Sequence, residues 1–170
     1  FSTGLSVSIQ INGIAHIQLT VKSSASIEFW RMLCGFMSMS TLIDNDDVHY
    51  SIGGHTGVLV RLAPEEKRSI RFDQDTSGLH HVCFRARSRE DVELMYSYIS
   101  SLTNGRIVHP PEEGGRFAPG YYSILFEDPD GIRIEVNFVP GKGHFGENGR
   151  LGKDGSGPAN RYGADGVTRT

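Results

Sequence analysis

Alternating apolar and polar residues predict two closely similar β-strands, each at the start of one of two related stretches of the chain. One strand lies within Ile14–Val21 and the other within Leu79–Ala86. Each carries a histidine at the same place, His16 in the first and His81 in the second. Similar offsets relate the later segments of the two stretches. A repeat that persists along the chain indicates an internal duplication.

Each copy is expected to hold a strand, a helix and three further strands. The helices are predicted at about 24–33 and 89–101, where apolar residues recur at helical spacing after the capping serines Ser23 and Ser88, and Gly35 is expected to end the first helix. Strands near 106–108, 121–126 and 132–138 complete the second copy, with a turn at 128–131 before the last. The pattern predicts an α+β fold in which two βαβββ modules, about 12–63 and about 78–139, form a curved mixed-sheet cup.

The 170 residues, 38% of them hydrophobic, fit one globular domain, which we place at 1–140. Residues 5–11 alternate in polarity and predict an extra N-terminal strand. Residues 141–170 form a glycine-rich tail, which we expect to dock on its own domain or on a partner subunit through Phe145 and Tyr162.

Charge and hydropathy exclude several classes of partner. A net charge of −3 offers no broad basic face for nucleic acid. No apolar run approaches the roughly 18 residues that would predict a membrane span. We therefore expect a soluble, cytoplasmic protein, acting as a homodimer on a small molecule, with no nucleic-acid or membrane partner.

The alternation of side chains along a strand predicts which polar residues share a sheet face. His16 lies out of phase with its apolar neighbours, and Glu135 lies out of phase with Ile134 and Val136, so both should face away from the helices. Equivalence with His16 selects His81 over its neighbour His80. If the sheets form a cup, the three side chains meet inside it and could bind a divalent metal.

These features together resemble the vicinal oxygen chelate superfamily, also called the glyoxalase, bleomycin-resistance and dioxygenase superfamily. The resemblance covers about residues 12–139 and is most specific over 120–136, which contains a tyrosine pair, the Asp-Pro-Asp-Gly turn and Glu135. It implies that His16, His81 and Glu135 are the ligands of a divalent metal (Fe, Mn, Ni or Zn) in a cup open to substrate.

One position departs from the glyoxalase I pattern, which usually places a second glutamate on the last strand of the first copy. We align that position with Arg61, and a cation cannot ligate a metal. This argues against lactoylglutathione lyase activity. The remaining two histidines and one carboxylate are the set of non-haem iron oxygenases and also resemble that of the fosfomycin-resistance thiol transferases.

Further site roles follow from the same expected face. Arg61 and Arg133 are candidates for binding a substrate carboxylate or phosphate, with pairing to an acid as the alternative. Tyr122 is a candidate catalytic acid or hydrogen-bond donor, and Glu135 is expected to be catalytic as well as a ligand.

The other chemically active side chains are expected to have no site role. Solvated histidines are expected at His49, His55, His109 and His144, and His80 is expected to be structural. Cys34 and Cys83 are expected to be small core residues, and Glu113 to lie on a loop.

Two functions compete at this stage. The first is a metal-dependent enzyme, a dioxygenase or a lyase or isomerase, that acts on a small oxygenated metabolite chelated to the metal. The second is a metal-free protein that sequesters a small molecule, as in the bleomycin-resistance branch.

Overall fold

A computed structural model describes residues 9, 11 and 13–140 of the chain. It divides into two compact units, Phe1–Ser69 and Ile70–Thr170, and each unit contains one of the two predicted copies. Each is described by itself below.

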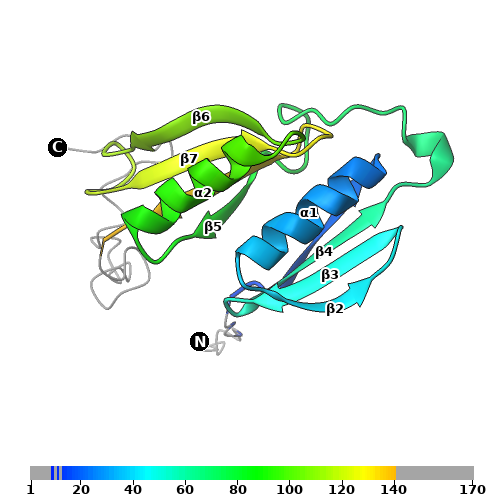
Figure 1. The fold of residues 1–170 in the computed structure, drawn as a ribbon, viewed down its shortest axis with the longest axis horizontal. Helices are drawn as coiled ribbons and strands as arrows, with labels where there is room; N and C mark the ends of the chain where they lie inside the picture. The colour runs from blue at the N-terminus through cyan, green and yellow to red at the C-terminus, as the bar shows by residue number, and fades with distance from the viewer. Residues whose placement is uncertain (1–8, 10, 12, 141–170) are drawn as a thin grey trace, which may run out of the picture. The chain divides into compact units, whose positions relative to one another are not determined.

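The first unit is a four-stranded sheet covered on one face by a single helix (Figure 1). The strand order is β1-β4-β3-β2, and β1 runs parallel to β4 while the other pairs are antiparallel. Its elements are β1 (His16–Val21), α1 (Ser24–Phe36), β2 (Ser40–Asp44), β3 (Val48–Gly53), β4 (Thr56–Leu62) and the short 3₁₀ helix η1 (Glu65–Lys67).

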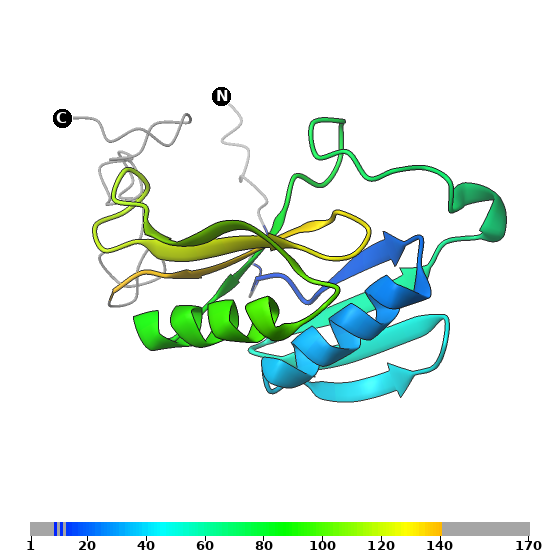
Figure 2. The ribbon, with the colours of Figure 1, turned by 45° about the horizontal axis from the view of Figure 1, so that its top comes forward.

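The second unit repeats this arrangement with the order β5-β8-β7-β6, in which only β5 and β8 are parallel. Its elements are β5 (Val82–Arg85), α2 (Arg89–Ser101), β6 (Arg106–Glu113), β7 (Tyr122–Glu127) and β8 (Arg133–Phe138). The view in Figure 2 shows each helix against one face of its own sheet. Two βαβββ modules of identical topology confirm the predicted duplication and the α+β fold.

Both helices begin where the sequence predicts. The side chains of Ser23 and Ser88 accept hydrogen bonds from the backbone N–H groups of Ser26 and Asp91, satisfying donors that a helix start leaves unpaired. The expected end of α1 is too early. Gly35 lies inside the last turn, and the chain leaves the helix only at Ser38, whose φ of 58° is incompatible with a further helical turn.

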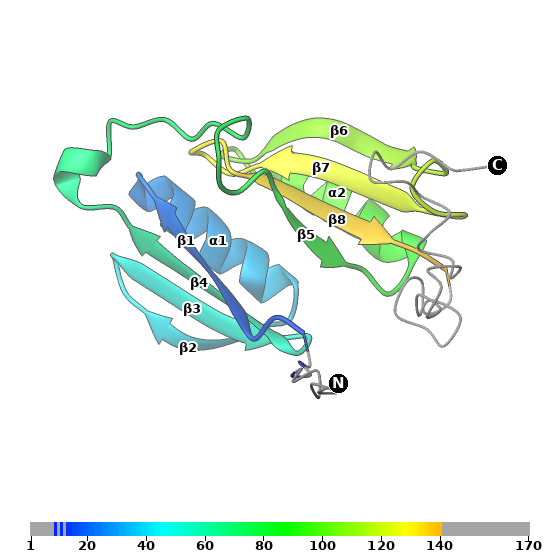
Figure 3. The same cartoon turned by 180° about the vertical axis from the view of Figure 1, so that it is seen from behind.

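The core of each unit lies between its helix and one face of its sheet. In the first unit the largest buried side chains are those of Phe29, Trp30 and Leu33, against Val58 and Val60 of the sheet. In the second unit, Val92, Met95 and Ile99 of α2 face Ile124, Phe126, Ile134 and Val136. The opposite face of each sheet lies in front of the helices in Figure 3.

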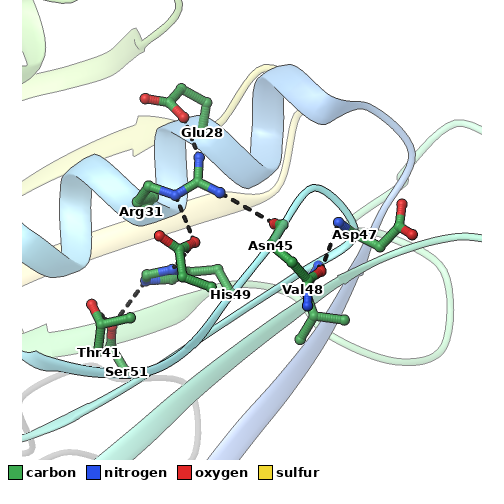
Figure 4. A network of polar contacts seen from close by, with 9 residues as sticks. Glu28, Arg31, Thr41, Asn45, Asp47, Val48, His49 and Ser51 are labelled. Carbon is green, nitrogen blue, oxygen red and sulfur yellow. Dashed lines mark hydrogen bonds and ion pairs between the residues drawn. The ribbon is translucent and has the colours of Figure 1, made fainter.

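A polar network holds the β2–β3 turn against α1 (Figure 4). Arg31 of the helix donates to Asp44 at 2.7 Å and to the Asn45 carbonyl at 3.3 Å. The hydrogen bond from Arg31 lowers the pKa of Asp44. His49 joins the network through Asp44 at 3.2 Å and Ser51 at 2.8 Å. His49 is fully buried, so the expectation of a solvated side chain was wrong.

The second unit differs from prediction in its third strand. β6 continues through two prolines to Glu113, which was expected on a loop. β6 lies at the edge of its sheet. It can hold prolines because no strand on its outer side needs their missing N–H groups. Glu113 forms an ion pair with Arg89 of α2 at 2.6 Å, and this contact lowers the pKa of the Glu113 carboxyl.

The predictions for the two ends fall mostly outside the described residues. These are the extra strand within 5–11 and the docking of the tail through Phe145 and Tyr162. Ile9 and Ile11 are described and are exposed. Within residues 9, 11 and 13–140, no helix is both long and apolar enough to cross a membrane.

The turn before β8 generates a stability prediction. Gly131 has a φ of +90°, and its N–H donates to the Asp128 carbonyl at 3.0 Å. A methyl group there would meet no neighbouring atom, so Gly131→Ala should destabilise through backbone strain alone, by about 1–3 kcal/mol in urea unfolding. Gly35→Ala is the matched control, because it also adds a methyl in open space but inside a helix. It should stabilise by about 0.5–1 kcal/mol. Equal effects of the two changes would contradict this explanation.

Candidate metal centre

His81 and Glu135 lie together on the open face of the second sheet. His81 directly precedes β5, and its Nε2 atom is 3.2 Å from Oε2 of Glu135 on β8. Two atoms that each lie about 2.1 Å from one metal ion are about 3.0–3.4 Å apart in octahedral or tetrahedral geometry. The observed separation therefore fits two neighbouring ligands of one ion, and the imidazole and carboxylate donors suit a divalent cation.

Parallel pairing of β5 with β8 produces this neighbourhood. Cys83 is in register with Glu135, and Val82 with Ile134, so the first residues of β5 align with the first residues of β8. Val82 is buried against the helix side, whereas Cys83 is exposed on the same face as His81. The expectation that Cys83 is a core residue was wrong, because the alternation of strand side chains turns it to the open face. Cys34, by contrast, is buried as expected.

The Cys83 thiol lies in an environment that disfavours its ionised form. Although the residue as a whole is exposed, its thiol is partly desolvated, and this desolvation and the negative charge of Glu135 both raise the pKa of the thiol. The side chain is therefore a neutral thiol beside Glu135 rather than an activated thiolate.

Tyr121 holds the other oxygen of the candidate carboxylate ligand. Its hydroxyl donates to Oε1 of Glu135, which leaves Oε2 directed at His81. The Tyr121 ring packs across Gly114, where an added Cβ atom would lie 2.5 Å from a ring carbon, and its centroid is 5.3 Å from that of Phe117. The glycine-rich segment thus leaves the space that Tyr121 needs to reach Glu135.

His80 makes the corresponding contact with His81. The two Nδ1 atoms are 2.7 Å apart, so one ring donates to the other and the Nε2 atom of His81 remains available toward Glu135. Hydrogen bonds of this kind, made by the atoms that do not face the metal, commonly orient ligands in metalloproteins. His80 was expected to be structural, and its contact is with a candidate ligand.

The electrostatics favour an ionised Glu135. Desolvation would raise its pKa, but hydrogen bonds from His81, Tyr121 and Ser123 outweigh it, and the pKa lies below its usual range. The pKa of Tyr121 is raised by burial and by the Glu135 carboxylate, so the phenol stays protonated and donates. A carboxylate that is ionised without a metal is ready to bind a cation.

Tyr122, the tyrosine singled out from the sequence, lies on the opposite face. It is buried, its hydroxyl donates to Glu93 of α2, and the Arg89 guanidinium lies 3.7 Å from the centre of its ring. This placement argues against the catalytic role expected for Tyr122. The missed signal was strand parity, because Tyr121 is in phase with Ser123, whereas Tyr122 is in phase with the buried Ile124.

His16 occupies the equivalent face of the first unit. It is exposed together with Gln18 and Thr20, while Leu19 and Val21 are buried beneath α1, as parity predicted. The described structure places it in a different unit from His81 and Glu135.

Tyr50 packs beside His16. A Cβ atom added at Gly57 would lie 2.9 Å from the Tyr50 hydroxyl and 3.1 Å from the His16 Cβ atom. The Tyr50 ring therefore crosses Gly57 next to the candidate ligand.

The register of the two parallel pairs corrects the alignment of Arg61 with Glu135. In the second unit, the residue two positions after His81 pairs with Glu135. In the first unit, the residue two positions after His16 is Gln18, and it pairs with Leu59. Leu59 is therefore the structural equivalent of Glu135, and Arg61 lies one step further along the same face. Like Arg61, leucine cannot ligate a metal.

The two candidate substrate-binding arginines differ in their surroundings. Arg133 lies on the same face as Glu135 and donates to Glu127 at 3.2 Å, and Arg106 contacts the same carboxylate at 2.9 Å. Arg133 thus pairs with an acid, which was the alternative to substrate binding. Arg61 is exposed and, among the described residues, forms no ion pair with an acid.

The donor set within one unit is a pair rather than a complete site. Across residues 9, 11 and 13–140, no three side chains of histidine, cysteine, aspartate or glutamate come close enough together to hold a metal ion. His81 and Glu135 fit two positions of such a site, and the role of His16 as a third ligand stays a prediction.

Comparisons with known proteins agree with this architecture. Among solved structures, a glyoxalase candidate from Bacillus halodurans is 24% identical, with a TM-score of 0.64 over 75% of this chain and 96% of the other. A glyoxylase/bleomycin resistance protein/dioxygenase domain from Frankia sp. EAN1pec is 18% identical, with a TM-score of 0.61 over 80% and 98%. A lactoylglutathione lyase from Agrobacterium tumefaciens is 20% identical, with a TM-score of 0.53 over 75% and 94%. These likenesses show a shared fold.

A search of curated proteins found no match. A family model, however, matches residues 13–136, which span both βαβββ modules and all three predicted ligands. The chain therefore belongs to the Glyoxalase/Bleomycin resistance protein/Dioxygenase superfamily.

Proposed function

We propose that this protein is a divalent-metal-dependent enzyme that acts on a small oxygenated metabolite. The observation that carries the proposal is the His81–Glu135 pair, with its 3.2 Å separation between an imidazole nitrogen and a carboxylate oxygen. Membership of a superfamily that contains metal-dependent enzymes supports it.

The residues around His81 and Glu135 support the proposal of a metal site over that of a simple surface ion pair. Glu135 has 15% of its side chain exposed, and its second oxygen is held by Tyr121. His81 is held by His80 through the ring nitrogen that does not face Glu135. An exposed ion pair needs no such support, whereas metal ligands are commonly oriented in this way.

A bound divalent ion would polarise two vicinal oxygens of the substrate and stabilise negative charge that develops on them. The chain's own contribution is to present an ionised carboxylate and an imidazole from neighbouring strands. Tyr121 keeps one oxygen of Glu135 occupied, so that the other is presented toward His81. The prediction that His16 is a third ligand can be tested by His16→Ala.

The reaction type that we propose is that of a dioxygenase or of a lyase or isomerase, and the identity of the metal would distinguish them. Leu59 stands at the structural equivalent of Glu135, so the first unit lacks the second carboxylate of the usual glyoxalase I set. Two histidines and one carboxylate form the set that non-haem iron oxygenases use. Iron in the purified protein would favour dioxygenase activity on catechols, and manganese, nickel or zinc would favour lyase or isomerase chemistry.

Removing one ligand of the pair should abolish tight metal binding. We expect His81→Ala to lose most of the metal that elemental analysis finds in the purified protein, because the change removes one of the two donors that lie 3.2 Å apart. His109→Ala is the control, since His109 is an exposed histidine on β6 in the same unit. Zero metal content in the unchanged protein would favour the alternative of metal-free sequestration, and equal metal content in both variants would remove His81 from the metal site.

The two adjacent tyrosines provide a sharper test of the site. Tyr121→Phe removes the hydroxyl that holds Glu135, and we expect metal affinity to fall about 10–100-fold in competition with a chelating dye. Tyr122→Phe removes a hydroxyl from the other face, where it contacts Glu93, and should leave metal affinity unchanged. If Tyr122→Phe weakened the metal as much as Tyr121→Phe, the assignment of faces would be wrong.

A further inference from the structure

A hollow lies in the first unit, toward the end of β4. Gln18, Leu59 and Arg61 line it from the open face of the sheet, and Asp47, Pro64 and Arg68 line it from the adjoining loops. It is open rather than enclosed, with a volume of about 410 Å³. All of these residues belong to one compact unit.

The charges around the hollow favour an anion. The guanidinium groups of Arg61 and Arg68 line the hollow together with the carboxylate of Asp47. Asp47 is the only acid among the described residues that line it, so two positive charges outnumber one negative charge. The Arg61 side chain makes no hydrogen bond or ion pair with a described residue, so its guanidinium donors are available to a ligand. Guanidinium groups bind carboxylates and phosphates through paired N–H donors.

A hydrogen bond to the backbone holds the guanidinium group of Arg68 in place. Its Nε atom donates to the Ala63 carbonyl at 2.8 Å, which fixes the plane of the guanidinium. The terminal nitrogens make no further hydrogen bond with a described residue. A guanidinium held in place by the backbone loses less conformational entropy on binding than a free surface side chain.

The hollow continues the face that carries His16. Gln18 is two residues from His16 on β1, and Arg61 pairs with Thr20, two residues further along. At about 3.3 Å per residue, Arg61 therefore lies about 13 Å along the strands from His16, measured between Cα atoms. Arginine side chains extend several ångströms from the backbone, so a ligand of ordinary metabolite size could span part of this face.

We propose that this hollow binds an oxyanion, the carboxylate or phosphate group of the substrate. This inference rests on the proposed function for the identity of the ligand as a substrate. The anion site itself does not depend on a metal. The substrate class that follows is a small metabolite that carries a carboxylate or a phosphate group.

The test is a calorimetric titration of the full chain, stripped of metal with a chelator, with inorganic phosphate and separately with malonate. Arg61→Gln and Arg68→Gln should each weaken binding of the preferred anion at least tenfold. Arg71→Gln is the matched control, because Arg71 is an exposed arginine near Arg68 in sequence but does not line the hollow. It should leave binding unchanged. Circular dichroism checks that each variant keeps its fold.

The outcomes separate the possible sources of the anion. Tighter binding of malonate indicates a substrate carboxylate, and tighter binding of phosphate indicates a phosphate ester. Absence of saturable binding of both probes, or equal weakening by the Arg61→Gln and Arg71→Gln changes, would overturn the proposal.

The same titration distinguishes this inference from the proposed function. Loss of anion binding in Arg61→Gln together with a metal-free purified protein would leave the anion site standing and remove the enzyme. Tight metal binding without an Arg61-dependent anion site would leave the proposed enzyme standing and remove the anion site.

Discussion

The parallel pairing of the first and last strands of each module positions the candidate metal ligands and Arg61. In the second unit it aligns Cys83 with Glu135 and so brings His81 to within 3.2 Å of the carboxylate. In the first unit the same pairing sets Gln18 beside Leu59 and Thr20 beside Arg61. A shift of one residue would turn these side chains to the other face, where the helix and the apolar core lie.

The helices leave one face of each sheet available for side chains that could bind a ligand. Each covers one face of its sheet and buries the apolar half of the strand pattern, so the opposite face can hold polar and titratable side chains without a core to disrupt. Two polar side chains that are buried on the helix side find partners there. His49 bonds Asp44 and Ser51, and Tyr122 bonds Glu93. The two faces thus divide structural hydrogen bonding from candidate ligand binding.

The duplication gives the two modules one topology but different open faces. The second unit carries His81, Glu135, Tyr121 and Cys83, a set rich in nitrogen, oxygen and sulfur atoms that can bind a metal or form hydrogen bonds. The first carries His16, with Tyr50 across Gly57, and further along a hollow lined by two arginines. The two related sheets thus carry different candidate sites, and leucine stands in the first unit at the position equivalent to Glu135.

The sequence by itself determined the duplicated βαβββ order, both helix starts and the faces of His16 and Glu135, because these depend on local periodicity and capping within one segment. Parity could also have distinguished Tyr121 from Tyr122, had it been applied to that strand. Only the tertiary structure decided that Leu59 rather than Arg61 matches Glu135, that Arg133 is paired with Glu127, and that His80 contacts His81. The physical reason is that alternation along a strand is set by neighbouring residues, whereas the register between strands depends on loops and packing that bring distant residues together.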